Sequence, residues 1–427
     1  MIEADLILEH AAELATPVGP APRLGKDLGA LRIVSDAAVA ADGEILVYVG
    51  PSRDLAGRVV LRPGGSRIDV SGKLLLPGFV DPHTHLPFAG SRETEFEQRL
   101  AGRSYQEIAA AGGGILSTVE RTRNAGAADL KAAALERLDR MLSLGTTTCE
   151  AKSGYGLSLD AELKQLRVLK EIADRHPVEI APTFLGAHTV PREYRERRDD
   201  YVREITETMI PRVVEEGLAE FCDVFCEGGA FTLAEAETVL QEGKRHGLAP
   251  RIHADQLSPL GGAELAARLG AASADHLEFI SEVGTEALAR AGVTAILLPG
   301  ADFFLMSRDH PPARRLVDAD VPVALATDLN PGTCMTESMP FVLLLACLEL
   351  RLSVGEAITA ATLNAAHSLR RADRVGSLEE GKQADIQVLQ IPNRHHLVYH
   401  FGVNHVETVI KRGRVVYRQS PVPSRFP

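Results

Sequence analysis

The side chains most suited to chemistry are histidines and aspartates that follow short apolar segments. The strongest local signal is G-F-V-D-P-H-T-H (residues 78–85), in which His83 and His85 come just after a candidate strand. Residues i and i+2 of an extended chain point the same way, so both imidazoles can reach one ion. Imidazole binds zinc, iron and related metals, and a carboxylate would complete a mixed nitrogen and oxygen shell. The pair alone is weak evidence, because a surface H-x-H dipeptide has the same spacing.

Further polar residues lie at or near the ends of other candidate strands. In chain order they are Lys152, Tyr155, His188, His253, Asp255, His276 and Asp328. A metal centre needs its ligands at about 2 Å, whereas neighbouring strands lie ~4.8 Å apart. An open sheet would spread these side chains along one edge, but a closed barrel gathers the carboxyl ends of its strands at one mouth. The constellation therefore predicts a closed barrel with a metal site at that mouth.

The middle of the chain has the rhythm of such a barrel. Short apolar segments alternate with helical stretches such as residues 130–144, where apolar residues recur every three or four positions. Eight candidate strands cover residues 74–80, 146–151, 179–187, 221–225, 250–254, 273–278, 293–299 and 322–327. This spacing predicts an α/β fold with a (β/α)8 TIM barrel. A doubly wound open sheet has the same local pattern, and only the polar residues argue against it.

The two ends of the chain read as β structure. Residues 31–34 and 44–49 are candidate strands, and Asp42-Gly43 between them is typical of a hairpin turn. Residues 384–391 and 406–417 alternate with period two, as strands with one buried face do. The expected domains are a composite β domain, residues 1–75 plus 377–427, and a barrel domain, residues 76–376.

The composition excludes several classes of protein. The 427 residues carry a formal net charge of −12, which is unfavourable for binding nucleic acid or anionic lipid. The longest apolar run, residues 339–348, is short of the roughly 20 residues that cross a bilayer. The first ten residues lack the basic start of a secretory signal, and the five cysteines lack C-x-x-C spacing. We expect a cytoplasmic protein that binds no nucleic acid and no membrane.

Two segments resemble the amidohydrolase superfamily. L-P-G-F-V-D-P-H-T-H (76–85) is similar to its first-strand signature, and G-S-L-E-E-G-K-Q-A-D-I (376–386) is similar to its return into the β lobe. The resemblance implies a distorted (β/α)8 TIM barrel with a small β-sandwich lobe formed by both termini. Five further segments resemble the imidazolonepropionase family of that superfamily, namely residues 88–96, 110–115, 152–157, 185–191 and 326–333.

The resemblance also implies a cofactor and a set of site residues. The implied metal ligands are His83, His85, His253 and Asp328. They would hold one zinc or iron ion per subunit, and the sequence does not choose between the two metals. The implied substrate contacts are Arg92, Tyr155, His188, Gln256, Asn330, Gly332 and Thr333. The expected partner is a small-molecule substrate, and a homodimer is the expected assembly although the sequence does not establish it.

The implied reaction is hydrolysis of the cyclic amide of 4-imidazolone-5-propanoate to N-formimidoyl-L-glutamate, in histidine degradation. Asp328 would ligate the metal, accept the proton of the attacking water and pass it to the leaving nitrogen; its alternative role is a helix N-cap. His276 would hydrogen-bond the water or the developing oxyanion, or else be a buried structural histidine. One metal is expected, because Lys152 follows the second strand and the bridging lysine of two-metal relatives lies on the fourth.

Arg92 is the candidate for binding the propanoate group, because a guanidinium pairs bidentately with a carboxylate. It lies seven residues beyond His85, in the expected loop over the mouth. Tyr155 lies between two glycines that allow close approach to a ligand, and His188 could donate to the ring carbonyl. Each has the alternative role of packing within its loop.

The glycines at 112–114 lack the other residues of a phosphate-binding loop, and we expect a mobile loop there.

Two rival functions stay open on the sequence. One is another amidohydrolase, such as a heterocyclic aminohydrolase, which commonly has Glu three residues after the fifth-strand histidine. That position holds Gln256, whose amide cannot shuttle protons, although the neighbouring Asp255 could partly substitute. The other rival is a non-catalytic scaffold on the same fold, which would be expected to lose metal ligands. Every implied ligand is present.

Overall fold

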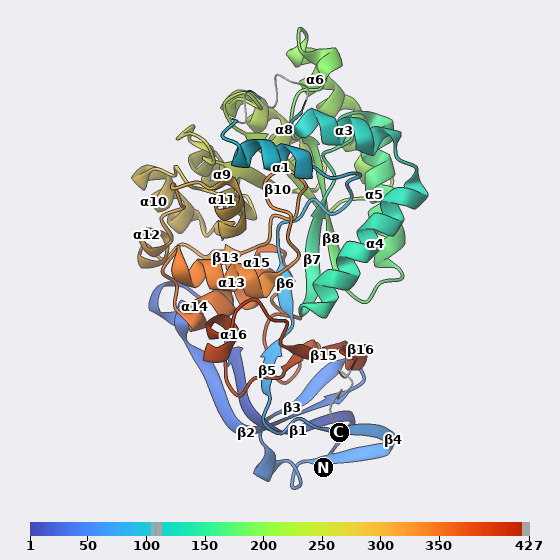
Figure 1. Cartoon of the computed structure of the whole chain (residues 1–427), viewed down its shortest axis with the longest axis vertical. Coiled ribbons are helices and arrows are strands. Elements are labelled where there is room, and N and C mark those ends of the chain that lie inside the picture. Colours follow the sequence, from blue (N-terminus) through green and yellow to red (C-terminus); the bar gives the residue numbers. More distant parts are fainter. Residues whose placement is uncertain (104–106, 108–112, 421–427) are drawn as a thin grey trace.

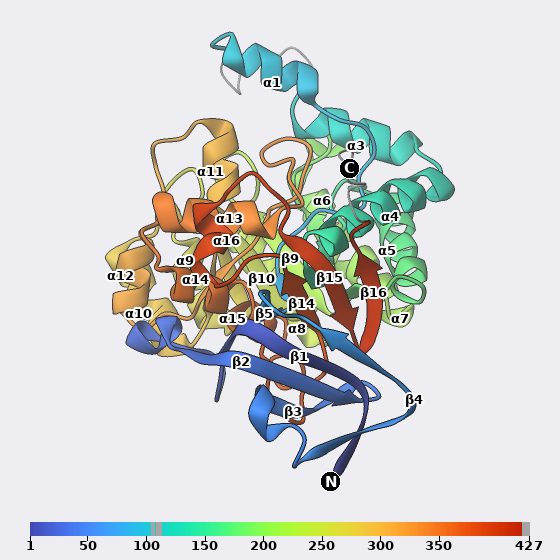
Figure 2. The ribbon, with the colours of Figure 1, turned by 60° about the horizontal axis from the view of Figure 1, so that its bottom comes forward.

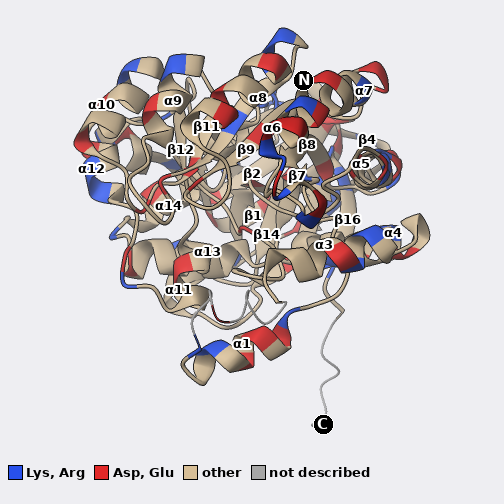
Figure 3. Ribbon diagram, turned by 90° about the horizontal axis from the view of Figure 1, so that it is seen from above, with Lys and Arg blue, Asp and Glu red and all other residues tan. Residues whose placement is uncertain are grey.

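The computed structural model describes residues 1–103, 107 and 113–420. A helix-wrapped barrel occupies one end and a strand-rich lobe the other (Figure 1). The start of the predicted mobile loop, through Gly112, lies outside the described residues. Acidic and basic residues are interspersed over the outer helices (Figure 3). Among the described helices, none has the length and apolar character needed to cross a membrane.

The lobe is an eight-stranded sheet built from both ends of the chain. Its order is β16-β15-β14-β5-β1-β2-β3, and β4 pairs with β1. The strands are β1 (Ile2–Pro17), β2 (Leu31–Asp42), β3 (Ile45–Pro51), β4 (Val59–Asp69), β5 (Leu74–Pro77), β14 (Ile386–Leu389), β15 (Val406–Lys411) and β16 (Arg414–Arg418). Figure 2 shows β14 to β16 beside β5 and β1. The expected lobe from both termini is confirmed.

The barrel is a second eight-stranded sheet whose strands follow chain order from β6 to β13. Every described pair of neighbours in it is parallel. The strands are β6 (Phe79–Asp81), β7 (Thr146–Lys152), β8 (Glu179–Ala187), β9 (Phe221–Cys226), β10 (Ala249–Ala254), β11 (Ser273–His276), β12 (Thr294–Leu297) and β13 (Val323–Leu325). The predicted TIM-barrel class is confirmed.

The barrel closes through residues that follow its first and last strands. Thr84 and Leu329 form a parallel bridge. The backbone N–H of His85 donates to Leu329 O at 2.9 Å, and that of Asp328 donates to His83 O at 3.1 Å. We call these contacts the closing seam. Three of the implied metal ligands therefore lie on the segments that complete the cylinder.

Most of the described helices cover the outside of the barrel, whereas α1 stands apart from its wall (Figure 2 and Figure 3). Those along the first half are α1 (Glu93–Leu100), α3 (Ile115–Asn124), α4 (Ala127–Ser143), α5 (Leu159–Ala173), α6 (Arg198–Arg203), α7 (Ile210–Glu215) and α8 (Leu233–Arg245). The others are α9 (Gly262–Leu269), α10 (Glu282–Ala291), α11 (Pro299–Leu305), α12 (Ala313–Asp318), α13 (Met339–Leu348), α14 (Val354–Ala360), α15 (Leu363–Ser368) and α16 (His395–Tyr399). In α4, which contains most of the predicted helix 130–144, Leu130, Ala134, Leu138 and Met141 are buried on one face.

The prediction of one strand over residues 74–80 is wrong. β5 pairs with β14 in the lobe, whereas β6 pairs with β7 in the barrel. The chain changes sheet at Gly78, where a Cβ would collide with the side chain of Thr147, so only glycine lets the backbone pass this close. The predicted domain boundary after residue 75 falls inside β5, and the division into domains stays a prediction.

A partly buried cluster of charges joins the lobe to the barrel. Glu179, the first residue of β8, lies 3.7 Å from the Nζ of Lys411 on β15 and 2.8 Å from nitrogens of Arg371 and Arg374. Burial raises the pKa of Glu179, but the three cations outweigh burial and lower that pKa from 4.5 to about 2. The ionised carboxylate therefore stabilises the folded state.

The substitution Glu179→Gln tests this junction. Because the folded-state pKa lies below the unfolded value, the stabilisation is complete above about pH 5 and is lost as the pH falls toward 2. Urea unfolding between pH 7 and 3.5 should show a difference between wild type and Glu179→Gln that shrinks below about pH 4.5. Glu216→Gln, which removes a surface pair with Arg167, is the control and should cost less. A Glu179→Gln difference that does not vary with pH would contradict the assignment.

Candidate active site and metal centre

A cavity of about 690 Å³ opens where the barrel strands end. The predicted site residues that line it are His85, Arg92, Tyr155, His188, His253, Gln256, His276, Asp328, Asn330 and Thr333. His83 is fully buried beside these imidazoles, 4.6 Å from His253 between ring centroids. Gly332 packs directly against the guanidinium of Arg92, where a Cβ would collide with it. The structure thus brings all the predicted site residues to one mouth.

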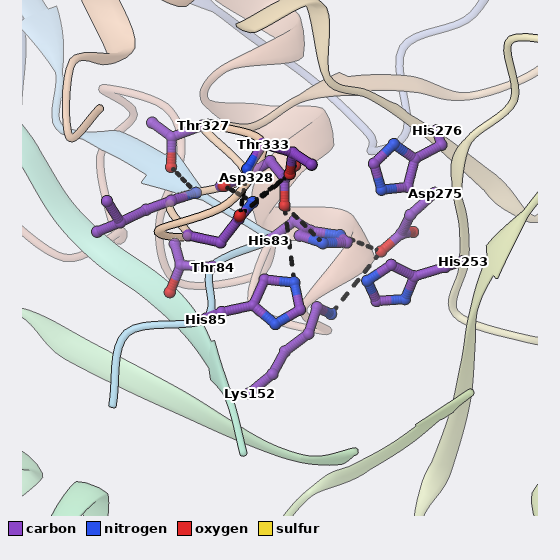
Figure 4. Close-up of polar contacts among 12 residues, drawn as sticks. His83, Thr84, His85, Lys152, His253, Asp275, His276, Thr327, Asp328 and Thr333 are labelled. Atoms are coloured by element: carbon purple, nitrogen blue, oxygen red, sulfur yellow. Dashed lines mark hydrogen bonds and ion pairs between the residues drawn. The ribbon is translucent and has the colours of Figure 1, made fainter. Parts of the chain in front are cut away.

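The candidate metal ligands converge on a small region (Figure 4). The Nε2 atoms of His83 and His85 lie 3.5 and 3.6 Å from Oδ1 of Asp328. Among the described residues, two sets have ligand atoms within 4.8 Å of one another. They share His83, and they are His83 with His85 and His253, and His83 with His276 and Asp328. The implied four ligands are thus divided between two overlapping sets, and His276 lies near enough to belong to the second.

The hydrogen bonds of the ligand histidines fit a metal ion. Nδ1 of His83 lies 2.6 Å from Asp275, and Nδ1 of His253 lies 3.1 Å from Asp223. An ionised carboxylate can only accept hydrogen bonds, so each Nδ1 carries the hydrogen and donates, and each Nε2 is left with a lone pair. In the described part of the chain, both of these Nε2 atoms are buried without a hydrogen-bond partner. An unpaired buried acceptor is costly, and a divalent cation at the centre would satisfy both.

Burial keeps the imidazoles neutral. It lowers the pKa of His83 and of His85 well below the usual 6.5. It also lowers the pKa of His188 to about 3 and that of His276 to about 4. A neutral imidazole has the lone pair that a ligand or a hydrogen-bond acceptor needs. At neutral pH these side chains are therefore available to a metal or to a polar substrate.

Asp328 is held by its own loop. Its backbone has φ +53°, and Asn330 Nδ2 donates to its carbonyl oxygen at 2.7 Å. Thr333 Oγ1 lies 3.4 Å from Oδ2 of Asp328. Burial raises the pKa of Asp328, which suits a group that takes up a proton. The alternative role as a helix N-cap is not observed, because the cap of α13 is Ser338.

Asn330 organises this loop. Its Oδ1 accepts from the backbone N–H groups of Gly332 and Thr333, each at 2.8 Å. Arg92 pairs through Nε and Nη2 with Glu95 at 2.8 and 2.7 Å. The guanidinium is thus fixed between its own helix and the loop at Gly332, at the edge of the cavity.

Tyr155 and His188 form one wall of the cavity, with 5.2 Å between their ring centroids. His188 stacks on His85 with 5.0 Å between ring centroids, and its Nδ1 lies 2.9 Å from the carbonyl oxygen of Gly154. Gly154 has φ +103°, a conformation that favours glycine. Buried Glu162 accepts from the backbone N–H of Gly154 at 3.0 Å and holds this loop in place. The flanking glycines therefore serve the loop geometry that presents Tyr155.

The sequence left open that Asp255 could take the place of a proton-donating Glu, but its carboxylate is turned to the start of α9. Its carboxylate accepts from the backbone N–H groups of Gly261, Gly262 and Ala263 at 2.8, 3.1 and 3.0 Å. It therefore caps the start of α9, and Gln256 beside it lines the cavity. A proton-donating role for Asp255 finds no support in these contacts.

Sequence reasoning missed the acids behind the ligands. Asp223 and Asp275 are fully buried next to His253 and His83. Glu278 lies 3.5 Å from Nδ1 of His276, and burial raises its pKa to about 8. An acid inside an apolar strand, as in F-C-D-V-F, indicates a buried polar partner. That signal was present for Asp223, but it does not say which residue the partner is.

Comparisons with known proteins give the family. Residues 74–416 match the model of the Amidohydrolase family. An imidazolonepropionase of Geobacillus kaustophilus (strain HTA426) is 50% identical over 420 residues, covering 98% of this chain and 99% of that protein. One of Shouchella clausii (strain KSM-K16) is 49% identical over 414 residues, covering 96% and 92%.

Solved structures share the fold. A 5-methylcytosine deaminase from Klebsiella pneumoniae, liganded with 5-fluorocytosine, superposes with a TM-score of 0.74 at 16% identity and covers 99% of each chain. A triazine hydrolase variant has a TM-score of 0.74 at 19% identity, covering 97% of this chain and 94% of that one. The chain belongs to the amidohydrolase family and, within it, to the imidazolonepropionases.

Proposed function

We propose that this chain hydrolyses the ring amide of 4-imidazolone-5-propanoate to N-formimidoyl-L-glutamate. The observation that carries the proposal is identity of about 50% with imidazolonepropionases over nearly the whole length. The site supports it, because three imidazoles and a carboxylate meet beside a cavity that a small polar molecule can enter. The reaction is a step of histidine degradation.

His83, His85, His253 and Asp328 would hold the metal. When bound there, a divalent ion lowers the pKa of the attacking water and polarises the ring carbonyl. The unpaired Nε2 atoms of His83 and His253 favour this assignment. Zinc and iron both suit imidazole with a carboxylate, so the identity of the metal stays open between them, at one ion per subunit.

Asp328 moves the proton. Its Oδ1 faces the Nε2 atoms of His83 and His85, so Oδ2 is the oxygen that receives the proton of the attacking water. The same carboxyl then protonates the ring nitrogen as the C–N bond breaks, which yields the open-chain product. His276, near Asp328 and neutral at pH 7, hydrogen-bonds the water or the developing oxyanion.

The cavity residues orient the substrate. Arg92 binds the propanoate carboxylate, and Tyr155 and His188 contact the imidazolone ring from the wall that they form. Gln256, Asn330, Gly332 and Thr333 complete the contacts. The amide of Gln256 cannot act as a general acid, because it does not give up a proton to a substrate. The carboxylate of Asp255 caps the start of α9. These contacts favour amide hydrolysis over the aminohydrolase alternative.

The homodimer and the cytoplasmic location stay predictions.

The direct test is product formation. Purified protein incubated with freshly generated imidazolone propanoate should form N-formimidoylglutamate, detected by mass spectrometry. Removal of the metal with a chelator should stop turnover, and readdition of zinc or iron should restore it, because the water is a poor nucleophile without the ion. Full activity in metal-free protein, or no product from metal-loaded protein, would refute the proposal.

Asp328→Asn tests the proton transfer. An amide cannot carry the proton, so kcat should fall by roughly 10²–10⁴-fold or more while circular dichroism shows an intact fold. Metal content is measured in parallel, because Asp328 is also a proposed ligand. Asp255→Asn is the matched control, since its amide oxygen can still accept from the start of α9, and it should keep its turnover. Activity of Asp328→Asn within tenfold of wild type would remove its role as base.

Arg92→Ala tests recognition of the propanoate. Loss of a charge-assisted hydrogen bond worth about 1.5–3 kcal/mol should raise KM about ten- to hundredfold and leave kcat less affected. Arg99→Ala on the same helix is the control, because Arg99 lies over Phe96 and Phe304 and is not among the cavity residues. Steady-state kinetics measure both variants. An unchanged kcat/KM for Arg92→Ala would take Arg92 out of the site.

A further inference from the structure

A lysine is buried beneath the candidate metal site. Lys152 is the last residue of β7, and its side chain is fully buried. Its Nζ lies 2.8 Å from Glu150 and 2.8 Å from Asp223, and 3.8 Å from Asp275. A buried ammonium is costly unless such partners surround it. None of the steps proposed for hydrolysis uses this cation.

The lysine contacts the two acids that hold two ligand histidines. Oδ2 of Asp223 pairs with Lys152, while its Oδ1 lies 3.1 Å from Nδ1 of His253. Oδ2 of Asp275 lies 2.6 Å from Nδ1 of His83 and faces the same ammonium. Figure 4 shows Lys152 joined to Asp275, which in turn is joined to His83. The ammonium of Lys152 thus contacts both acids, which in turn bind the imidazoles of His253 on β10 and of His83 just after β6.

We propose that Lys152 is a positioning residue for the metal site, acting through Asp223 and Asp275 on His253 and His83. The inference rests on the metal centre of the proposed function. Carboxylates behind ligand imidazoles fix the ring orientation and commonly change metal affinity 10–100-fold when removed. Here Lys152 is the cation that both carboxylates have in common, and Asp275 also faces Arg251 at 3.6 Å. Without the ammonium, Asp223 loses its ion pair and the repulsion among Asp223, Asp275 and Glu150 increases, so both imidazoles are held less firmly.

The neighbouring charges make this role specific to Lys152. Arg251, which is also fully buried, lies 3.6 Å from Asp275, and its guanidinium donates to Pro82 O at 2.7 Å. Arg251 and Asp223 are register partners on β10 and β9, but no ion pair between their side chains is found among the described residues. Of the two buried cations, Lys152 is therefore the one that connects Asp223 with Asp275. Loss of Arg251 would leave the pair between Lys152 and Asp223 in place.

The chain offers a matched control for a buried lysine. Lys411 on β15 is only 2% exposed and pairs with Asp385 at 2.7 Å. It also lies 3.3 Å from the hydroxyl of Thr148, near the start of β7, whereas Lys152 ends that strand. Lys411→Met removes the same kind of ion pair far from the metal ligands. A loss of zinc affinity that came only from a weakened fold would appear in both variants.

The experiment measures zinc affinity in the absence of substrate. Metal-free Lys152→Met, Lys411→Met and wild type are titrated with zinc against a chromogenic chelator. The double variant Glu150→Gln/Lys152→Met removes one acid with the lysine, so the net charge beneath the site is unchanged. We expect zinc to bind 10–100-fold more weakly to both Lys152 variants and within about threefold of wild type to Lys411→Met. If Lys152→Met does not fold, the zinc affinity of the double variant tests the proposal.

A second readout separates positioning from stability. Zinc affinity is also measured for Asp223→Asn alone and for Asp223→Asn combined with Lys152→Met. If Lys152 acts through the aspartates, the fold-loss of zinc affinity in the combined variant should be smaller than the product of the two single fold-losses. Cobalt-loaded Lys152→Met should also show an altered visible spectrum, and Lys411→Met should not. Wild-type zinc affinity and spectrum in a folded Lys152 variant would overturn the proposal, as would an equal loss in Lys411→Met. Since no substrate is present, these results do not depend on whether imidazolone propanoate is turned over.

Discussion

The metal site can form only because the barrel closes. Bonds from a metal to imidazole nitrogen or carboxylate oxygen are about 2 Å long, so the first and last strands must meet before their side chains can share an ion. The contacts of the closing seam involve the ligands themselves, because Asp328 N–H donates to His83 O and His85 N–H donates to Leu329 O. A slip of this seam would displace two histidines and the aspartate together. The same hydrogen bonds therefore specify the fold and the site.

A polar barrel interior imposes a second requirement, which is that each buried charge has a partner. Asp223 and Asp275 stand behind the imidazoles, and Lys152 stands behind both acids. At the other end of the barrel, Glu179 and Lys411 pair where the lobe meets the strands. Opposite charges are thus paired locally at each end. At the mouth the two acids bind Nδ1 of His83 and of His253, which leaves the Nε2 lone pairs of both imidazoles for an ion. The contacts that satisfy the buried charges therefore also orient the imidazoles of the metal site.

The sequence predicted the barrel and its histidines because each leaves a local signal. Alternating strand and helix segments have their own periods, and a histidine after a strand is visible without knowing its neighbours. The acids behind the ligands could not be assigned, since His83 and Asp275 are 192 residues apart and pair only once the barrel closes. The run 74–80 was misjudged for a related reason. Its apolar residues fit one strand, and only the packing of Gly78 against Thr147 shows where the chain changes sheet.

We expect one ion among the residues that barrel closure brings together. Anomalous diffraction from crystals of the zinc-loaded protein can locate this ion. One anomalous peak should lie about 2 Å from Nε2 of His83 and His253, and His85 and Asp328 should complete its ligands. A peak elsewhere, or zinc-loaded crystals in which these side chains bind no ion, would contradict a metal site at the closing seam.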